Sequence, residues 1–165
     1  MEVWDLYDEN KELINGVSHI RDSSDPIPRG MYHIAVCTYI ITKNGKALIT
    51  QRSKNKTKPL MWEASGGSVL QGEQSIDACV RELKEETSIE ISKEELKYLN
   101  EERGDDWILE CYYAVVDNLN LDSLVLQDSE VADAKLVDLD ELYIMNEAGY
   151  LLGGVYENFH RLLKS

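Results

Sequence analysis

The sequence predicts a single α+β domain in which helices flank a mixed β-sheet. The chain has 165 residues, a length that suits one domain. Segments rich in β-branched and aromatic residues dominate its middle, and segments with helical periodicity bracket them. We therefore expect one domain over residues 1–165, with an N-terminal hairpin and linker in 1–29 and a core in 30–165.

The first half of the chain predicts strands and turns. Residues 2–22 predict a hairpin, because two strand-like segments flank the polar turn DENK. A loop is expected at 23–30, where Pro, Ser and Gly gather. Two further strands are expected at 32–42 and 47–53, joined by a tight turn at Asn44-Gly45, which is a strong hairpin signal.

The second half adds two helices to further strands. Residues 60–73 mix small, aromatic and Gly residues and predict irregular backbone. Amphipathic helices are expected at 75–87 and 154–164. The other elements are a short helix or strand entry at 94–102, a strand at 105–116, a loop with a strand fragment at 119–130, and a strand that begins at 132 and runs toward 142.

The composition disfavours several classes of partner. The net charge is -14 and the pI is about 4.6, so the chain lacks the basic surface that nucleic acids and anionic membranes attract. Cys37, Cys79 and Cys111 are widely spaced among apolar neighbours and predict buried free thiols rather than a redox or zinc site. With no basic leader segment and no apolar run of about 18 residues, a cytoplasmic protein is expected.

The helix expected at 75–87 carries carboxylates on one side. At about 100° per residue, the opposite, core-facing stripe consists of Ile76, Val80, Leu83 and Thr87. Glu82, Glu85 and Glu86 cluster away from that stripe, where they repel one another. Ser75 is the expected N-cap of the helix.

Two interpretations of these carboxylates stay open on the residues alone. One is a solvated acidic face. The other is a metal site, because glycines at 66, 67 and 72 lie just upstream and let the backbone approach a ligand closely. Carboxylate oxygens together with a backbone carbonyl are the hard ligands that magnesium prefers.

Residues 67–89 resemble the Nudix box, whose pattern is G-x5-E-x7-R-E-U-x-E-E-x-G-U with U a bulky aliphatic residue. The matching residues are Gly67, Glu73, Arg81, Glu82, Leu83, Glu85, Glu86 and Ile89. One position departs, because Ser88 stands where the pattern has Gly. That glycine normally ends the helix in a left-handed turn, and serine there costs about 1 kcal/mol. A looser resemblance extends over about residues 30–142.

The resemblance implies an α/β/α sandwich that hydrolyses a nucleoside diphosphate linked to another group. Water activated by a metal attacks phosphorus, and a carboxylate accepts its proton. The implied metal is Mg²⁺, with Mn²⁺ as an alternative, and the implied ligands are Glu82, Glu85, Glu86 and the Gly66 carbonyl. The implied catalytic residues are Glu85, Glu86 and Glu130, the last with a plain surface acid as its alternative. Gly67, Glu73 and Arg81 are implied to be structural, the last two as a salt bridge between loop and helix.

Basic residues after the strand at 47–53 are candidate substrate ligands. Arg52 either clamps a phosphate or forms a structural ion pair. Lys54, Lys56 and Lys58 form the densest basic run, which either steers an anionic substrate or lies in a solvated loop. Arg52 and Lys58 are the substrate-binding residues that we expect.

Two rival functions stay open. The N-terminal hairpin, His33 and the segment QRSKNK resemble the isopentenyl-diphosphate isomerase branch of the same superfamily. That enzyme has a cysteine and a histidine where this chain has Gly66 and Ser68, which argues against an isomerase. The other rival is a regulatory domain that binds a nucleotide without turnover. The expected partner is a small-molecule diphosphate, with a homodimer as an open alternative.

Overall fold

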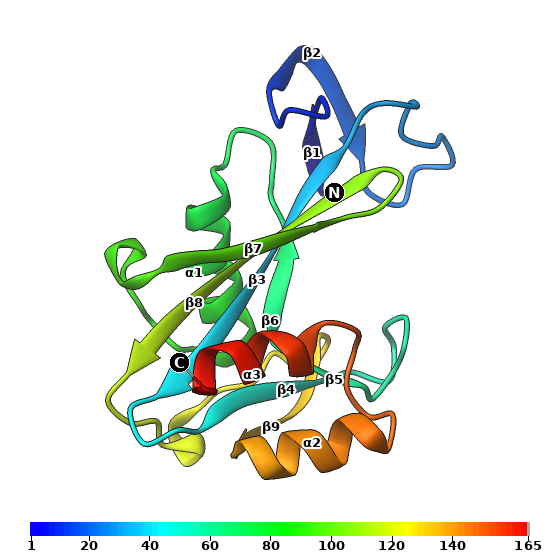
Figure 1. The fold of residues 1–165 in the computed structure, drawn as a ribbon. Helices are drawn as coiled ribbons and strands as arrows, with labels where there is room; N and C mark the ends of the chain where they lie inside the picture. The colour runs from blue at the N-terminus through cyan, green and yellow to red at the C-terminus, as the bar shows by residue number, and fades with distance from the viewer. Residues whose placement is uncertain (165) are drawn as a thin grey trace.

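A computed structural model describes residues 1–164 as a mixed β-sheet with three α-helices and an N-terminal hairpin (Figure 1). The expected α+β class is confirmed. The strands are β1 (Val3–Tyr7), β2 (Leu13–Ile20), β3 (His33–Thr42), β4 (Ala47–Arg52), β5 (Trp62–Glu63), β6 (Ser65–Ser68), β7 (Lys97–Arg103), β8 (Trp107–Val116) and β9 (Val131–Val137). The helices are α1 (Ser75–Thr87), α2 (Leu139–Glu147) and α3 (Val155–Lys164), with short 3-10 turns η1 (Lys93–Glu95) and η2 (Leu121–Ser123). None of these helices has the length and apolar character that crossing a membrane requires.

Two long parallel strands, β3 and β8, form the centre of the seven-stranded sheet. They pair without a break from His33↔Trp107 to Thr42↔Val116. The strand order is β5-β4-β3-β8-β7, while β6 pairs with β3 and β9 pairs with β4. Helix α1 covers one face of this sheet, and α2 and α3 cover the other (Figure 1).

Alternating side chains on β3 supply both layers of the core. Val36 and Ile40 belong to the cluster that includes Leu83 of α1. Tyr39 belongs to the cluster that includes Phe159 of α3, and the two rings meet edge to face at 4.7 Å between centroids. Because successive strand residues point to opposite faces, one strand can anchor helices on both sides.

The pairing of β4 differs from the expected hairpin. The turn at Asn44-Gly45 is present, but β3 and β4 pair at Ile41↔Ala47, whereas β4 pairs with β9 along its whole length. The reason is that β6 takes the edge of β3 from Ala35 to Thr38. A strand distant in sequence therefore provides the main partner of β4.

Two segments fold differently from the sequence prediction. Residues 60–73 contain the short strands β5 and β6 within otherwise irregular backbone. Residues 139–147 form α2 instead of continuing the strand that begins near 132. Asp138 is the N-cap of this helix, and its Oδ1 accepts a hydrogen bond from Glu141 N–H at 2.9 Å.

The N-terminal hairpin is attached beside the loop that leads into α1. Trp4 of β1 stacks on His33 of β3 at 4.1 Å between ring centroids. The backbone N–H of Gly72 donates to Asp5 Oδ2 at 2.8 Å. The hairpin is thus connected both to the central strand and to the residues that precede α1.

Candidate active site

Helix α1 is positioned by its apolar side, which packs on the centre of the sheet. Ala78 and Leu83 are fully buried in the core cluster that contains β3 residues. In the stripe that the sequence predicts, Leu83 and Thr87 are buried, and Ile76 and Val80 are half-buried. Glu82 and Glu86 lie outside this apolar stripe, against β6 at the edge of the contact.

The start of α1 is held by a neighbouring strand. The sequence predicts Ser75 as the N-cap, but Gln74 takes this place and makes no side-chain capping bond. Ser75 instead donates its hydroxyl to Oε1 of Glu110 on β8 at 3.1 Å. A carboxylate beside the first turn also interacts favourably with the helix dipole, so Glu110 supports the helix where no local cap does.

Two adjacent glycines on β6 allow close contact with α1. A Cβ atom at Gly66 would lie 2.3 Å from Val36 O, and one at Gly67 would lie 2.2 Å from Oε1 of Glu82. At Gly66 the neighbouring atom is backbone and leaves no room for a side chain, whereas at Gly67 the Glu82 carboxylate would have to move. The carboxylate of Glu82 therefore rests directly against the backbone of β6.

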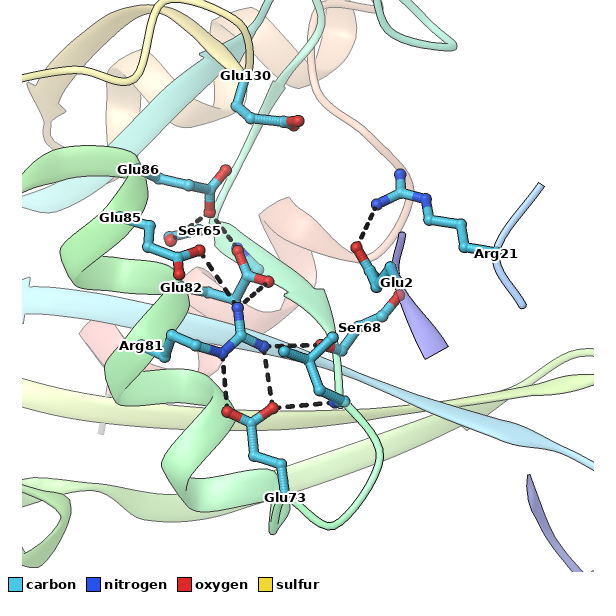
Figure 2. Close-up of polar contacts among 12 residues, drawn as sticks. Glu2, Arg21, Ser65, Ser68, Glu73, Arg81, Glu82, Glu85, Glu86 and Glu130 are labelled. Carbon is cyan, nitrogen blue, oxygen red and sulfur yellow. Dashed lines mark hydrogen bonds and ion pairs between the residues drawn. The ribbon is translucent and has the colours of Figure 1, made fainter. Parts of the chain in front are cut away.

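Glu86 is the most deeply buried of the three carboxylates, with 2% of its surface exposed. Its Oε1 accepts hydrogen bonds from the Ser65 hydroxyl at 2.7 Å and from Gly66 N–H at 3.0 Å (Figure 2). Burial is the main cause that raises the pKa of Glu86 to about 7; the bond from Ser65 opposes this shift, and the charge of Glu82 adds to it. Ionised Glu86 is therefore costly to keep in this site without a cation nearby.

Arg81 ties the carboxylates to the loop before the helix (Figure 2). Its Nε and Nη2 donate to the two oxygens of Glu73 at 2.8 and 2.9 Å, and Nη2 also reaches Ser68 O at 3.0 Å. Its Nη1 lies 2.9 Å from Glu82 Oε1 and 3.2 Å from Glu85 Oε2. Burial alone would raise the pKa of Glu73, but the bonds from Arg81 hold it below its ordinary value. The salt bridge between Glu73 and Arg81 thus joins loop and helix.

The site opens into two adjoining cavities. The first, of about 560 Å³, is lined by Gly66, Gly67, Arg81, Glu82, Glu85 and Glu130, together with residues of the hairpin. The second, of about 300 Å³, shares Arg21, Lys56, Gly66 and Gly67 with the first and has an aliphatic wall made by Ala35, Leu109, Leu152 and Val155. Glu86 is not a lining residue of either cavity, since its carboxylate turns onto Ser65 and Gly66.

Glu130, which lies outside the motif, comes to the same cavity. Its side chain is drawn above that of Glu86 in Figure 2. Its Oε2 lies 2.6 Å from Lys56 Nζ, and its backbone carbonyl accepts a hydrogen bond from Ser53 N–H at 3.0 Å. Glu130 therefore lies at the first cavity in an ion pair with Lys56.

The two expected substrate ligands lie differently. Lys58 lines neither cavity, whereas Lys56 of the same basic run lines both. Arg52 lines the second cavity, but its Nη1 pairs with Glu63 Oε2 at 2.6 Å and its Nε donates to Thr57 O at 2.8 Å. The structural ion pair, which was the alternative interpretation of Arg52, is therefore present.

The hairpin contributes two residues that the sequence does not point to. Glu2 and Arg21 both line the first cavity, and Arg21 Nη1 lies 3.0 Å from Glu2 Oε2 (Figure 2). No local pattern around either residue suggests a site. Their place follows from the docking of the hairpin, which is a long-range feature of the fold.

The carboxylates fit a divalent cation by their chemistry rather than by a ready-made geometry. Among residues 1–164, no three His, Cys, Asp or Glu side chains already converge as a metal site. The guanidinium of Arg81 lies against Glu82 and Glu85, so these two point to it and not to a common centre. Burial raises the pKa of Glu82 as well as that of Glu86, because water does not solvate the charged form of either carboxylate well. A hard cation with oxygen ligands would supply that compensation.

Comparison of the sequence with known proteins shows the family of the chain. The chain matches the NUDIX domain family over residues 31–154. It is 37% identical over 155 residues to the uncharacterized Nudix hydrolase lmo0368 of Listeria monocytogenes. This alignment covers 90% of this chain and 87% of that protein. It is also 40% identical over 62 residues to the CTP pyrophosphohydrolase of Escherichia coli, in an alignment that covers 38% of this chain and 46% of that protein.

Solved structures show the same fold. DR0079 from Deinococcus radiodurans superposes with a TM-score of 0.74 at 22% identity, over 97% of this chain and 98% of that chain. The NUDIX domain of Shewanella oneidensis NrtR, solved in complex with ADP ribose, gives a TM-score of 0.65 at 19% identity, over 81% of this chain and 87% of that chain.

Proposed function

The chain belongs to the Nudix family of pyrophosphohydrolases, and we propose that it uses a divalent metal ion to hydrolyse a nucleoside diphosphate linked to another group. The observation that carries this proposal is the cavity in which Glu82 and Glu85 of α1 meet the Gly66-Gly67 backbone and Glu130. Carboxylates that repel one another destabilise a helix. In a chain of net charge -14, a bound cation would offset the repulsion between these carboxylates.

The residues of α1 and β6 would hold the metal. Glu82, Glu85 and Glu86 would supply carboxylate oxygens, and the Gly66 carbonyl would supply a further one. Mg²⁺ suits these hard donors, with Mn²⁺ as the alternative. A bound divalent ion supplies charge that screens the diphosphate and lowers the pKa of water.

The residues around the ion would position and deprotonate the attacking water. Glu130 is the proposed proton acceptor and Glu85 the alternative, because both side chains line the cavity. Lys56 pairs with Glu130 and also lines the second cavity, so it can offer positive charge to a phosphate. Arg21 lines both cavities and would act in the same way. The aliphatic wall of the second cavity would contact the group beyond the diphosphate.

We also propose a cytoplasmic location for the protein. Cys37, Cys79 and Cys111 are free thiols, which supports a reducing, cytoplasmic environment. A homodimer is proposed only as an alternative to a monomer, and light scattering in solution tests it.

A hydrolysis screen tests the proposed function. Purified protein would be incubated with nucleoside triphosphates including CTP, dinucleoside polyphosphates, ADP ribose and other nucleotide sugars, and coenzyme A. Each reaction would contain Mg²⁺, Mn²⁺ or EDTA, with products separated by chromatography. Release of a nucleoside monophosphate with metal but not with EDTA is the expected result. Tight binding of a nucleotide without any product would instead favour a regulatory domain.

A further inference from the structure

Ser88, the one residue that departs from the motif, occupies a conformation that favours glycine. It is the C-cap of α1, with φ 66 and ψ 7, and its N–H donates to Lys84 O at 2.9 Å. A residue with a Cβ atom is strained in this left-handed region, and glycine is not. A serine at this place therefore raises the question of what its hydroxyl does.

The hydroxyl of Ser88 is bonded on both of its sides. It donates to Thr87 O, and it accepts a hydrogen bond from the backbone N–H of Val125 at 2.9 Å. Val125 belongs to the segment 118–130, which lies within the connection from β8 to β9. The side chain of Val125 is 70% exposed, whereas its neighbour Leu124 packs against the core cluster that contains residues of α1, so the hydrogen bond to Ser88 adds to this packing. A glycine at 88 would leave this N–H without its partner.

A second contact at the end of α1, two residues further along the same segment, leads by hydrogen bonds to Glu130. Gln127 donates its N–H to the carbonyl of Glu86, also at the end of α1, at 3.0 Å. The carbonyl of Gln127 then accepts the N–H groups of Glu130 and Val131, each at 2.8 Å. The end of α1 therefore holds residues 125 and 127, and residue 127 holds the turn that carries Glu130.

We propose that Ser88 is a positioning residue that anchors the segment 118–130 to α1 and thereby fixes Glu130 over the carboxylates. The inference rests on the proposed function, because it assigns Glu130 a part in hydrolysis. Ser88 itself touches neither cavity. It acts by joining the element that carries Glu85 and Glu86 to the one that carries Glu130.

Three substitutions separate the effect of the hydrogen bond between Ser88 and Val125 from the effect of backbone strain at residue 88. Ser88→Gly removes both the strain and the acceptor, and Ser88→Ala keeps the strain and removes the acceptor. Ser88→Asn tolerates the left-handed conformation and restores an acceptor oxygen. Asp22→Gly is the control for backbone strain alone, because Asp22 has φ 63 and, in the part of the chain that the structure describes, makes no hydrogen bond to Val125 or Ser88.

The first readout is hydrogen exchange of the Val125 amide, measured by nuclear magnetic resonance. Ser88→Gly and Ser88→Ala should exchange about tenfold faster than wild type, as expected for one lost hydrogen bond. Ser88→Asn and Asp22→Gly should exchange at about the wild-type rate. Equal exchange rates of the Val125 amide in Ser88→Gly and wild type would overturn the proposal that Ser88 anchors this segment.

The second readout is turnover of the substrate that the screen identifies. Ser88→Gly should lower kcat about fivefold to tenfold with KM nearly unchanged, while its resistance to urea stays equal or rises. In a Glu130→Gln background the same substitution should have no further effect, because it acts through Glu130. Additive losses, or an unchanged kcat in Ser88→Gly, would overturn the inference alone. Failure of the proposed function would appear separately, as absence of turnover in the wild type.

Discussion

Replacing Glu86 with Gln should stabilise the fold when divalent metal is removed. Burial raises the pKa of Glu86 from its ordinary value of 4.5 to about 7, so the ionised form is disfavoured in the native state. This difference corresponds to about 3 kcal/mol, at about 1.4 kcal/mol for each pH unit. Glutamine keeps an oxygen that can accept the bonds from Ser65 and Gly66. Because the new amide N–H group also needs partners, we expect a gain of about 1–3 kcal/mol at about pH 8.

The pH dependence of this gain has a defined sign. Since its native pKa is raised, Glu86 binds a proton more readily in the native state than in the unfolded state. The wild type is therefore fully stabilised by this group below about pH 4.5 and loses that contribution as the pH rises through about 7. Glutamine does not titrate, so the advantage of Glu86→Gln should be absent near pH 4.5 and constant above about pH 7.

Urea denaturation in EDTA, followed by tryptophan fluorescence from about pH 4.5 to pH 8, measures this difference. Glu85→Gln is the matched control, because its side chain is 48% exposed and lies on the same helix. We expect the control to stay within about 0.5 kcal/mol of wild type throughout. Equal stability of Glu86→Gln and wild type at about pH 8, or a difference that does not change with pH, would refute the reasoning.

Three further predictions concern the scaffold of the site. Gly67→Ala would push a Cβ atom to 2.2 Å from Glu82 Oε1, so turnover should fall at least about tenfold while urea stability changes by less than about 1 kcal/mol; an unchanged kcat would contradict this. Arg81→Lys cannot keep the two-point bond to Glu73 and should lower the free energy of unfolding by about 1–2 kcal/mol, with an unchanged urea midpoint as the contrary result. Burial lowers the pKa of His33 below 6.5, so the wild type should lose stability as the pH falls below 6.5. His33→Phe should lose less stability over the same pH range, as measured by urea titration. Parallel stability curves for the two proteins would show that His33 is not responsible.

The parts of the site that the sequence predicts are those set by helical spacing. The interval from Glu82 to Glu86 spans about one helical turn, so the three carboxylates share a side wherever the helix docks. The ion pair between Glu73 and Arg81 is also present, and it joins residues eight positions apart. Helical spacing is enough for the shared side, whereas the salt bridge is predicted by the resemblance to the Nudix box.

The parts that the sequence does not predict depend on contacts between distant elements. Ser75 looks like an N-cap from its position alone, but Glu110 of β8 engages its hydroxyl. The turn at Asn44-Gly45 predicts a β3–β4 hairpin, yet β6 and β9 take most of the pairing. Arg21 reaches the cavity only because the hairpin docks beside the loop before α1. In each case the partner lies far along the chain, where no local pattern can reveal it.

The central claim is that buried carboxylates of α1 hold a divalent ion that hydrolysis requires. Its most direct test is the initial rate of hydrolysis of the identified substrate, measured against Mg²⁺ concentration in wild type and Glu86→Gln. We predict no rate above background in EDTA, a saturable rise with Mg²⁺ in wild type, and a rate at least about 100-fold lower in the variant, which corresponds to about 2.7 kcal/mol of transition-state stabilisation. A wild-type rate that does not depend on metal, or a variant that keeps the wild-type rate, would contradict the account.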